Sequence, residues 1–481
     1  MGKYRSKRGA SLVMDMKAMI EEKMPLTLGD IIEIAEKNDL RFVDVVLAET
    51  EVQTGKNREE ILEEVLKEFE HNLRAVEIGL TTGSSLLLGA TGAQLNNMEG
   101  FRLFKDEFVD KALVNTIAAQ VGNHSIGLNP CAGTGDSCPY TGFIRAMYDT
   151  GYEKQRVAEI AAILLKVGSM FRVGKTTTGC NMEGFGAGSA AVAAATVELH
   201  GGSARATERA MVIAISPTIG VPCTPRVMVP ALCATHIGGA ILMGTLAAGL
   251  AAKTDMEVNV PIDVMLAMAT EVHPISGKAI VPTVVEFMQP FFKTKEPVER
   301  LIPQSIKEEE KAKIEQTLVK AKQVAKKLAQ GAKPITNTLG EAVVGGSSQA
   351  VGSPTNTGRI AHFLAKGKIK KVKIELYPEL FARRGINVPG VLMGAVYGSS
   401  TADSKMYKEV IGLVEKEGIE VEVVKNDEYQ VQKVTIVTDE GTYMVDALNR
   451  GGGRLVLRDA TPSRQEAIDI AKKLGIVLVE A

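Results

Sequence analysis

The chain has 481 residues, 45% of them hydrophobic and 23% charged, a composition typical of folded globular proteins and not of disordered ones. Its 56 basic and 57 acidic residues give a net charge of −1, so no overall positive charge attracts nucleic acid or an anionic membrane. We therefore expect a small-molecule partner and neither nucleic acid nor membrane. At this length, roughly two or three domains are expected.

Two segments bear on localisation. The first eight residues are basic, but no long apolar segment follows them, so they do not resemble a secretory signal and we expect a cytoplasmic protein. The run Val227–Ala252 is uncharged and long enough to span a membrane, but it is rich in Gly, Ala and Thr and contains Pro230 and His236. We expect it to form a buried core helix.

The first elements in chain order are predicted helices between Leu26 and Gly79, where apolar and charged residues alternate at helical spacing. These are expected to be amphipathic surface helices. From Thr81 to Leu250 the sequence is rich in Gly, Ala and small polar residues, with long uncharged stretches. This region is expected to form the centre of the protein.

The last third of the chain has a different pattern. A charged segment from Glu308 to Lys327 has Glu and Lys four residues apart and an apolar stripe, which predicts an exposed connecting helix. Alternating patterns then predict strands at 372–376, 419–423, 434–437 and 455–457. The predicted fold class is α+β, with a large helical domain at 1–295, a connecting helix at 296–333, and a small α+β domain with an antiparallel sheet at 334–481.

Five cysteines in a chain expected to be cytoplasmic do not indicate a disulfide framework, so they are either inert core thiols or metal ligands. Cys180, Cys223 and Cys233 lie in segments interrupted by Gly or Pro, which leave backbone N–H groups free to face sulfide ions. Thiolates are also soft ligands suited to iron. The spacing alone does not separate a cluster site from buried thiols, because the short run of cysteines typical of ferredoxins is absent.

Motifs around the cysteines occur in a characteristic order. The turn Asn129–Gly133 is followed by Gly179–Gly184 (Gly-Cys-Asn-Met-Glu-Gly), the helix end Val197–Gly202 and Cys223–Pro225 (Cys-Thr-Pro). These resemble Pro-Thr-Ala-Gly, Gly-Cys-Gln-x-Glu-Val-Gly, Glu-Leu-x-Gly-Gly and Cys-Asp-Pro in the α subunit of iron–sulfur-dependent bacterial L-serine dehydratases. Cys233 lies close to where that family has its third cysteine ligand, but one residue nearer to Cys223.

The C-terminal third resembles the β subunit of the same family. Gly352–Thr357 is similar to its loop Gly-Pro-Ser-Ser-Ser-His-Thr, Ile374–Tyr377 to the strand after it, and Asn449–Gly453 to its Ser-x-Gly-Gly-Gly. The chain therefore resembles an α region followed by a β region in one polypeptide. One departure bears on the substrate, because Asn356 stands where the family has histidine.

The resemblance implies a four-iron, four-sulfur cluster held by Cys180, Cys223 and Cys233, with one iron lacking a protein thiolate, and no pyridoxal phosphate. Such an iron can act as a Lewis acid on the substrate hydroxyl. The implied activity is that of a lyase in amino-acid metabolism, which converts L-serine, or a similar β-substituted amino acid, to a 2-oxo acid and ammonia.

Other residues are candidates for acid–base chemistry and substrate binding. His236 and Glu183, each three residues after a predicted cysteine ligand, are the candidate catalytic residues. A core histidine and a carboxylate at a helix N-terminus are the structural alternatives for these two. Cys131 and Cys138 are either close to the cluster or simply buried. The candidate substrate-binding residues are Ser84, Ser85, Asn123, Thr355, Asn356 and Thr357.

Two other functions stay open. A related lyase could remove hydrogen sulfide from cysteine on a similar cluster, and the replacement of a histidine by Asn356 would permit this. A cluster-bearing sensor would convert no amino acid at all. A homo-oligomer, most simply a symmetric dimer, is expected in each case.

Overall fold

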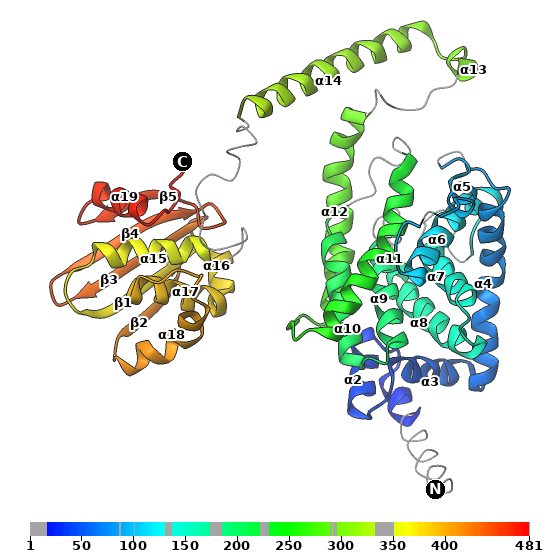
Figure 1. The fold of residues 1–481 in the computed structure, drawn as a ribbon, viewed down its shortest axis with the longest axis horizontal. Helices are drawn as coiled ribbons and strands as arrows, with labels where there is room; N and C mark the ends of the chain where they lie inside the picture. The colour runs from blue at the N-terminus through cyan, green and yellow to red at the C-terminus, as the bar shows by residue number, and fades with distance from the viewer. Residues whose placement is uncertain are drawn as a thin grey trace, which may run out of the picture. The chain divides into compact units, whose positions relative to one another are not determined.

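The computed structural model describes residues 17–85, 88–100, 102–129, 137–173, 185–221, 230–288, 291, 296–331 and 351–480, with the backbone alone for 172–173, 230–233 and 331. The chain divides into two compact units, Met1–Ala325 and Lys326–Ala481 (Figure 1). The main hydrophobic core of each unit lies within that unit. The elements of the first unit are helices, and the second holds a five-stranded sheet, so the predicted α+β class is confirmed.

The first unit is built from helices and a 3₁₀ turn. They are α2 (Leu28–Lys37), α3 (Phe42–Thr54), α4 (Arg58–Leu80), α5 (Thr91–Asn96), α6 (Glu107–Ile126), α7 (Ser137–Asp149), α8 (Lys154–Val173), α9 (Gly188–Leu199), α10 (Ala204–Ile215), the 3₁₀ turn η2 (Ser216–Thr218), α11 (Pro230–Lys253), α12 (Ile262–Met288), α13 (Glu296–Glu299) and α14 (Gln304–Gly331). The last helix, α14, runs past the boundary of the unit at Ala325.

Helix α3 differs from the sequence prediction, which expected amphipathic surface helices in this part of the chain. Seven of its residues, Phe42, Val43 and 45–49, are buried, so α3 is a core helix. The Glu49 side chain is 2% exposed, and its carboxylate pairs with Lys166 of α8 at 2.7 Å. A buried carboxylate is stable only with such a partner, and the partner lies far along the sequence.

Helix α9 is the centre of the first unit. Every residue from Gly188 to Glu198 is buried, and the helix contacts α7, α8, α10 and α11. Its side chains are mostly small, which lets the neighbouring helices approach closely. At Gly244 of α11, a Cβ atom would lie 2.6 Å from Val192 Cγ1 and 2.8 Å from the Ser189 carbonyl oxygen.

Helix α11 contains most of the long uncharged run. Its segment Ala234–Lys253 is the one helix in the described part of the chain that is long and apolar enough to cross a membrane. Ile237 and Ile241 are buried, and the helix packs on α9 and α10. Leu246 is 56% exposed. The helix therefore has one buried face and one partly exposed face.

The second unit combines a sheet with helices. Its elements are α15 (Gly352–Leu364), β1 (Ile369–Leu376), α16 (Pro378–Ala382), α17 (Arg384–Tyr397), α18 (Ser404–Lys416), β2 (Glu420–Lys425), β3 (Val431–Thr438), β4 (Thr442–Asn449), β5 (Leu455–Thr461) and α19 (Arg464–Lys473).

The sheet has the strand order β2-β1-β3-β4-β5. The four predicted strands are present, and β4 was missed. Strand β2 runs parallel to β1, and the other neighbouring strands are antiparallel. The sheet is therefore mixed, whereas the sequence prediction was a wholly antiparallel sheet. The reason is the long connection through α16, α17 and α18, which returns the chain in the direction of β1.

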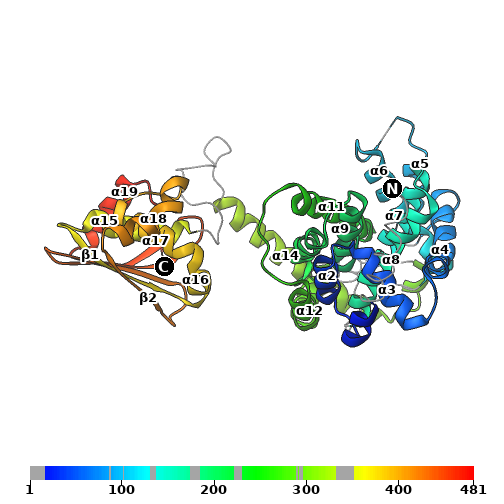
Figure 2. The ribbon, with the colours of Figure 1, turned by 90° about the horizontal axis from the view of Figure 1, so that it is seen from below.

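One face of this sheet is covered by helices (Figure 2). Helices α15 and α17 pack on the central strands, and α19 packs on α15 and β5. Buried residues alternate along β1 and align across the sheet, where Val372 pairs with Ile436 and Ile374 pairs with Val434. This alternation is the pattern from which the strands were predicted.

Candidate functional site

The starts of α7 and α9 lie against the second and third turns of α11. At Gly188, the first residue of α9, a Cβ atom would lie 2.9 Å from Pro139 Cγ of α7 and 3.0 Å from Ala240 Cβ of α11. The Phe185 ring, just before α9, stacks on the His236 ring of α11 with centroids 6.1 Å apart and planes 16° apart. We call this group the helix-start cluster; its members are Cys138, Pro139, Phe185, Gly188, His236, Ile237 and Ala240.

Each of these three helices follows a segment that contains a cysteine. Cys131, Cys180 and Cys223 lie in residues 130–136, 174–184 and 222–229, which are outside the described residues. Cys233 lies in the first turn of α11, and its side chain is outside the described part as well. Three cysteine-bearing segments therefore lead into α7, α9 and α11, and the starts of α7 and α9 meet on the N-terminal half of α11.

Helix starts provide a particular electrostatic environment. The first backbone N–H groups of a helix have no partner within the helix, and the helix dipole adds a partial positive charge at this end. Helices α7, α9 and α11 are 13, 12 and 24 residues long. The adjacent starts of α7 and α9, and the start of α11, would each stabilise a nearby thiolate, carboxylate or other anion.

Cys138 is a member of the helix-start cluster. It is 0% exposed, and its thiol donates a hydrogen bond to Gln120 Oε1 of α6 at 2.9 Å. It packs in one apolar group with Ile237 of α11 and Leu128. The sequence left open whether Cys138 has a role at the iron–sulfur cluster or is simply buried; the structure shows that it is buried, and a role at the iron–sulfur cluster stays a prediction.

The chain just before Pro130 is held by side chains from two helices. Asn72 of α4 is 0% exposed; its Oδ1 accepts from Asn129 N at 2.7 Å, and its Nδ2 donates to the Asn129 carbonyl oxygen. Asn123 Oδ1, at the end of α6, accepts from Leu128 N at 2.8 Å. Asn123 was predicted to bind substrate, and within the described residues its side-chain oxygen holds the backbone that leads into residues 130–136.

The predicted serines lie in the turn after α4. Ser84 is exposed, and Ser85 is 7% exposed, with its Oγ accepting from Leu88 N at 2.6 Å. Leu88 packs with Val121 of α6, and Ala234 near the start of α11 lies against the same group. The turn that carries both serines therefore reaches the α11 end of the helix-start cluster.

The predicted catalytic and ligand residues have different outcomes. His236 is half-buried in the helix-start cluster. Glu183, Cys180 and Cys223 lie outside the described residues. Among the residues that the structure describes, no group of three or more His, Cys, Asp or Glu side chains could hold a metal ion. The assignment of the cysteine ligands stays a prediction.

The predicted substrate-binding residues of the second unit lie inside it. Gly352–Thr357 was expected to be a loop, and it forms the first turns of α15, where Pro354 is compatible with a helix start. Thr355, Asn356 and Thr357 are 1%, 2% and 0% exposed. Within the described residues, they make hydrogen bonds inside their own unit.

A polar network that the sequence did not indicate surrounds these residues. Gln432 of β3 is buried and donates to Ser353 Oγ at 2.7 Å and to Thr357 Oγ1 at 2.8 Å. Asn356 Nδ2 donates to the Gly453 carbonyl oxygen at 2.9 Å. Residues 451–453 have φ angles of 71°, 55° and 83°, which glycine adopts without steric cost, so the predicted glycine turn is confirmed.

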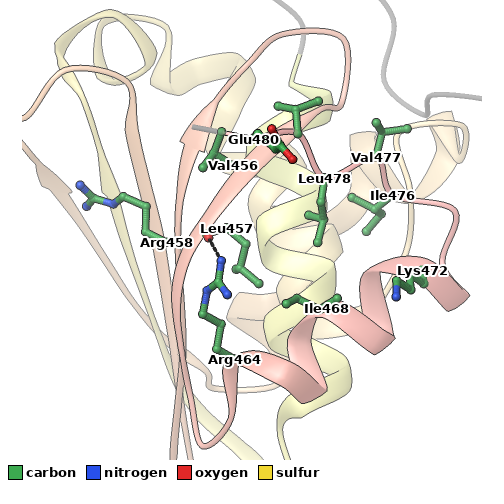
Figure 3. A pocket seen from close by; sticks show the side chains of 11 residues that line it. Val456, Leu457, Arg458, Arg464, Ile468, Lys472, Ile476, Val477, Leu478 and Glu480 are labelled. Atoms are coloured by element: carbon green, nitrogen blue, oxygen red, sulfur yellow. Dashed lines mark hydrogen bonds between the residues drawn. The ribbon is translucent and has the colours of Figure 1, made fainter.

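A groove of about 770 Å³ lies elsewhere in the second unit, between β5, α19 and the residues that follow α19 (Figure 3). Arg464 donates to the Leu457 carbonyl oxygen at 3.0 Å, and Ile468 and Leu478 provide apolar surface. None of the predicted site residues lines this groove. We therefore take the helix-start cluster as the candidate active site.

Phe185, Gln120 and Asn72 are the residues at this site that sequence reasoning missed. Phe185 lies five residues after Cys180 and directly after its motif, but no sequence signal distinguishes its ring from a core aromatic residue. Gln120 and Asn72 lie within ordinary helical patterns. Their role depends on partners that are 18 and 57 residues away in the sequence.

The fold and the site define a mostly helical protein whose cysteine-bearing segments lead to a shared cluster of helix starts, followed by an α+β unit. The chain is 27% identical over 222 residues to the protein described as probable L-serine dehydratase, alpha chain, from Bacillus subtilis (strain 168). The match covers 41% of this chain and 68% of that relative. No family model matches the chain. The predicted resemblance to the α chain of L-serine dehydratases is confirmed, and the chain length fits an α-like region followed by a β-like region.

Proposed function

We propose that this chain is a lyase that converts L-serine, or a closely similar β-substituted amino acid, to a 2-oxo acid and ammonia, with a four-iron, four-sulfur cluster as cofactor. The observation that carries the proposal is the packing of the starts of α7 and α9 on the N-terminal half of α11, since each of these three helices follows a cysteine-bearing segment. The similarity to a probable L-serine dehydratase alpha chain supports it independently.

The chemistry of the donor set fits this cofactor. Cys180, Cys223 and Cys233 would hold three of the irons, since thiolates are the usual protein ligands of such clusters. The positive ends of α7, α9 and α11 would offset the negative charge that thiolates and sulfides bring. When bound, the cluster would supply an iron without a protein thiolate as a Lewis acid for the leaving hydroxyl.

The chain's own residues would bind the amino acid and move its α-proton. His236 is half-buried and its ring is stacked on Phe185, so an imidazole, the commonest general acid or base in enzymes, is held beside the start of α9. Glu183 would hold the ammonium group, and Ser84 and Asn123 the carboxylate. Loss of the α-proton and the β-hydroxyl leaves an enamine, which tautomerises to an imine; water then hydrolyses it to the 2-oxo acid and ammonia.

A second candidate is a lyase that removes hydrogen sulfide from L-cysteine. It is favoured by Asn356, which replaces a histidine of the serine dehydratases and is hydrogen-bonded to Gly453 and Arg359. An asparagine side chain is a poor acid or base at neutral pH, so serine chemistry that needs a histidine here would be lost. In either case we expect a cytoplasmic homo-oligomer without nucleic-acid or membrane partners.

The ligand assignment is tested by serine substitutions in anaerobically purified protein. Cys180→Ser, Cys223→Ser and Cys233→Ser should each abolish the brown colour and lower the iron content. Cys131→Ser and Cys138→Ser are the matched controls and should keep both. A full cluster in any of the first three variants would refute the assignment.

The acid–base assignment is tested with a pair of histidines. His236→Gln should lower pyruvate release from serine by about 100-fold or more with unchanged iron content. His124→Gln is the matched control, because His124 is an exposed residue of α6, and it should leave turnover unchanged. Normal turnover of His236→Gln would remove this histidine from the mechanism. Comparing pyruvate release from L-serine and L-cysteine separates the two candidate activities.

A further inference from the structure

Helix α14 is long and makes few contacts. It spans 28 residues, and within the described part of the chain its side-chain ion pair with another element is that of Lys320 with Glu286 of α12 at 3.2 Å. Lys320 Nζ also lies 5.1 Å from the centre of the Phe287 ring. A helix gains most of its stability in a protein by packing an apolar face, and this helix packs little of its own.

The helix nevertheless has an apolar stripe with a regular repeat. Ile314, Leu318, Ala321, Ala325 and Leu328 are spaced by four, three, four and three residues, which is the a and d pattern of a coiled coil. Leu318 is 46% exposed and Leu328 is 71% exposed. Such a stripe on an exposed helix is typical of a surface that pairs with another helix.

We propose that α14 pairs in an antiparallel coiled coil with α14 of a second copy of this chain. In this register Leu318 lies in one layer with Ala321 of the second copy, and Ile314 lies in one layer with Ala325 of the second copy. The arrangement is two-fold symmetric, so each layer occurs twice and the interface is closed.

The charges beside the stripe select the antiparallel direction. With Leu318 at position a, both Glu315 and Lys322 occupy position e. Antiparallel helices bring e positions of the two copies together, so Glu315 faces Lys322 of the second copy, twice in the dimer. Parallel helices would bring g next to e of the following heptad, so Glu310 would face Glu315 of the second copy, and this pair is repulsive.

The test is the dimerisation constant of the full-length chain, measured by analytical ultracentrifugation at low salt. Glu315→Lys should weaken the dimer by about tenfold, because two attractive pairs become repulsive, and Lys322→Glu should do the same. The double variant Glu315→Lys/Lys322→Glu should restore the wild-type constant. Glu309→Lys is the matched control: it makes the same charge change at the outward position f and should leave the dimer unchanged.

The outcomes separate the alternatives. A tighter dimer in Glu315→Lys would overturn the antiparallel direction, because parallel helices would then pair this lysine with Glu310. Leu318→Glu should give a monomer with an unchanged helical circular dichroism spectrum. A wild-type monomer, or a dimer that none of these variants weakens, would overturn the proposal and leave the stripe of α14 uncovered or covered within its own chain. This inference does not depend on the proposed enzymatic function.

Discussion

Replacing Gly244 by alanine should destabilise the first unit, whereas replacing Gly249 by alanine should stabilise it. Both glycines lie inside α11, five residues apart. A Cβ atom at Gly244 would lie 2.6 Å from Val192 Cγ1 and 2.8 Å from the Ser189 carbonyl oxygen, and the second contact is with backbone, which cannot rotate away. At Gly249 no atom lies within 4 Å of the added Cβ.

The magnitudes follow from two opposing effects. Alanine in place of glycine inside a helix stabilises by roughly 1 kcal/mol, and this gain applies to both positions. Overpacking a tight contact costs about 1–3 kcal/mol, and this cost applies only to Gly244→Ala. Gly249→Ala should therefore raise the free energy of unfolding by up to about 1 kcal/mol, and the two variants should differ by about 1–3 kcal/mol.

Urea denaturation of both variants, followed by far-ultraviolet circular dichroism, measures this difference directly. Because α9 packs on α11 both at Gly244 and at the helix-start cluster, Gly244→Ala should also lose iron more readily than Gly249→Ala. Equal stabilisation by both substitutions would refute the close packing of α9 on α11, and with it the geometry on which the candidate site depends.

Two further predictions concern buried charges. Burial alone would raise the pKa of Asp44 and of Glu159, but hydrogen bonds led by Arg41 outweigh it and hold both below their usual values of 3.8 and 4.5. The resulting stability is present above about pH 4.5 and is lost as the pH falls, so the melting temperature should drop on acidification. The variant Arg41→Gln should show a smaller drop in melting temperature. An equally steep drop in this variant would contradict the assignment. Lys166→Met should lower the free energy of unfolding by about 3–5 kcal/mol, because Glu49 is left buried without its cationic partner, and adding Glu49→Gln should recover part of the loss. Equal losses for the single and the double variant in urea denaturation would argue against the ion pair.

Much of the fold follows from local patterns in the sequence. Alternation of apolar and polar residues located β1, and the charged stretch from Glu308 to Lys327 located α14, because these patterns reflect which face of an element meets water. Strand β4 was missed because its sequence, Thr-Tyr-Met-Val-Asp-Ala-Leu-Asn, mixes polar and apolar residues with few β-branched ones. Helix α3 was misjudged because the partner of Glu49 is 117 residues away.

The candidate site could be predicted only in part. Glycine and proline near Cys180 and Cys223 marked the segments that precede helix starts, since these residues interrupt helices. That the starts of α7 and α9 pack on the N-terminal half of α11 is a property of tertiary packing, set by small residues such as Gly188 that permit close approach. The stacking of Phe185 on His236 follows from this convergence, and no local pattern indicates it.

The most direct test of the proposed function is to measure iron, acid-labile sulfide and pyruvate formation from L-serine in the same anaerobic preparation of the full-length chain. We predict about four irons and four sulfides per chain, as for a single four-iron, four-sulfur cluster, together with pyruvate formation that disappears when the cluster is lost in air. Pyruvate formation by iron-free protein, or a full cluster with no turnover of serine or cysteine, would contradict the proposal.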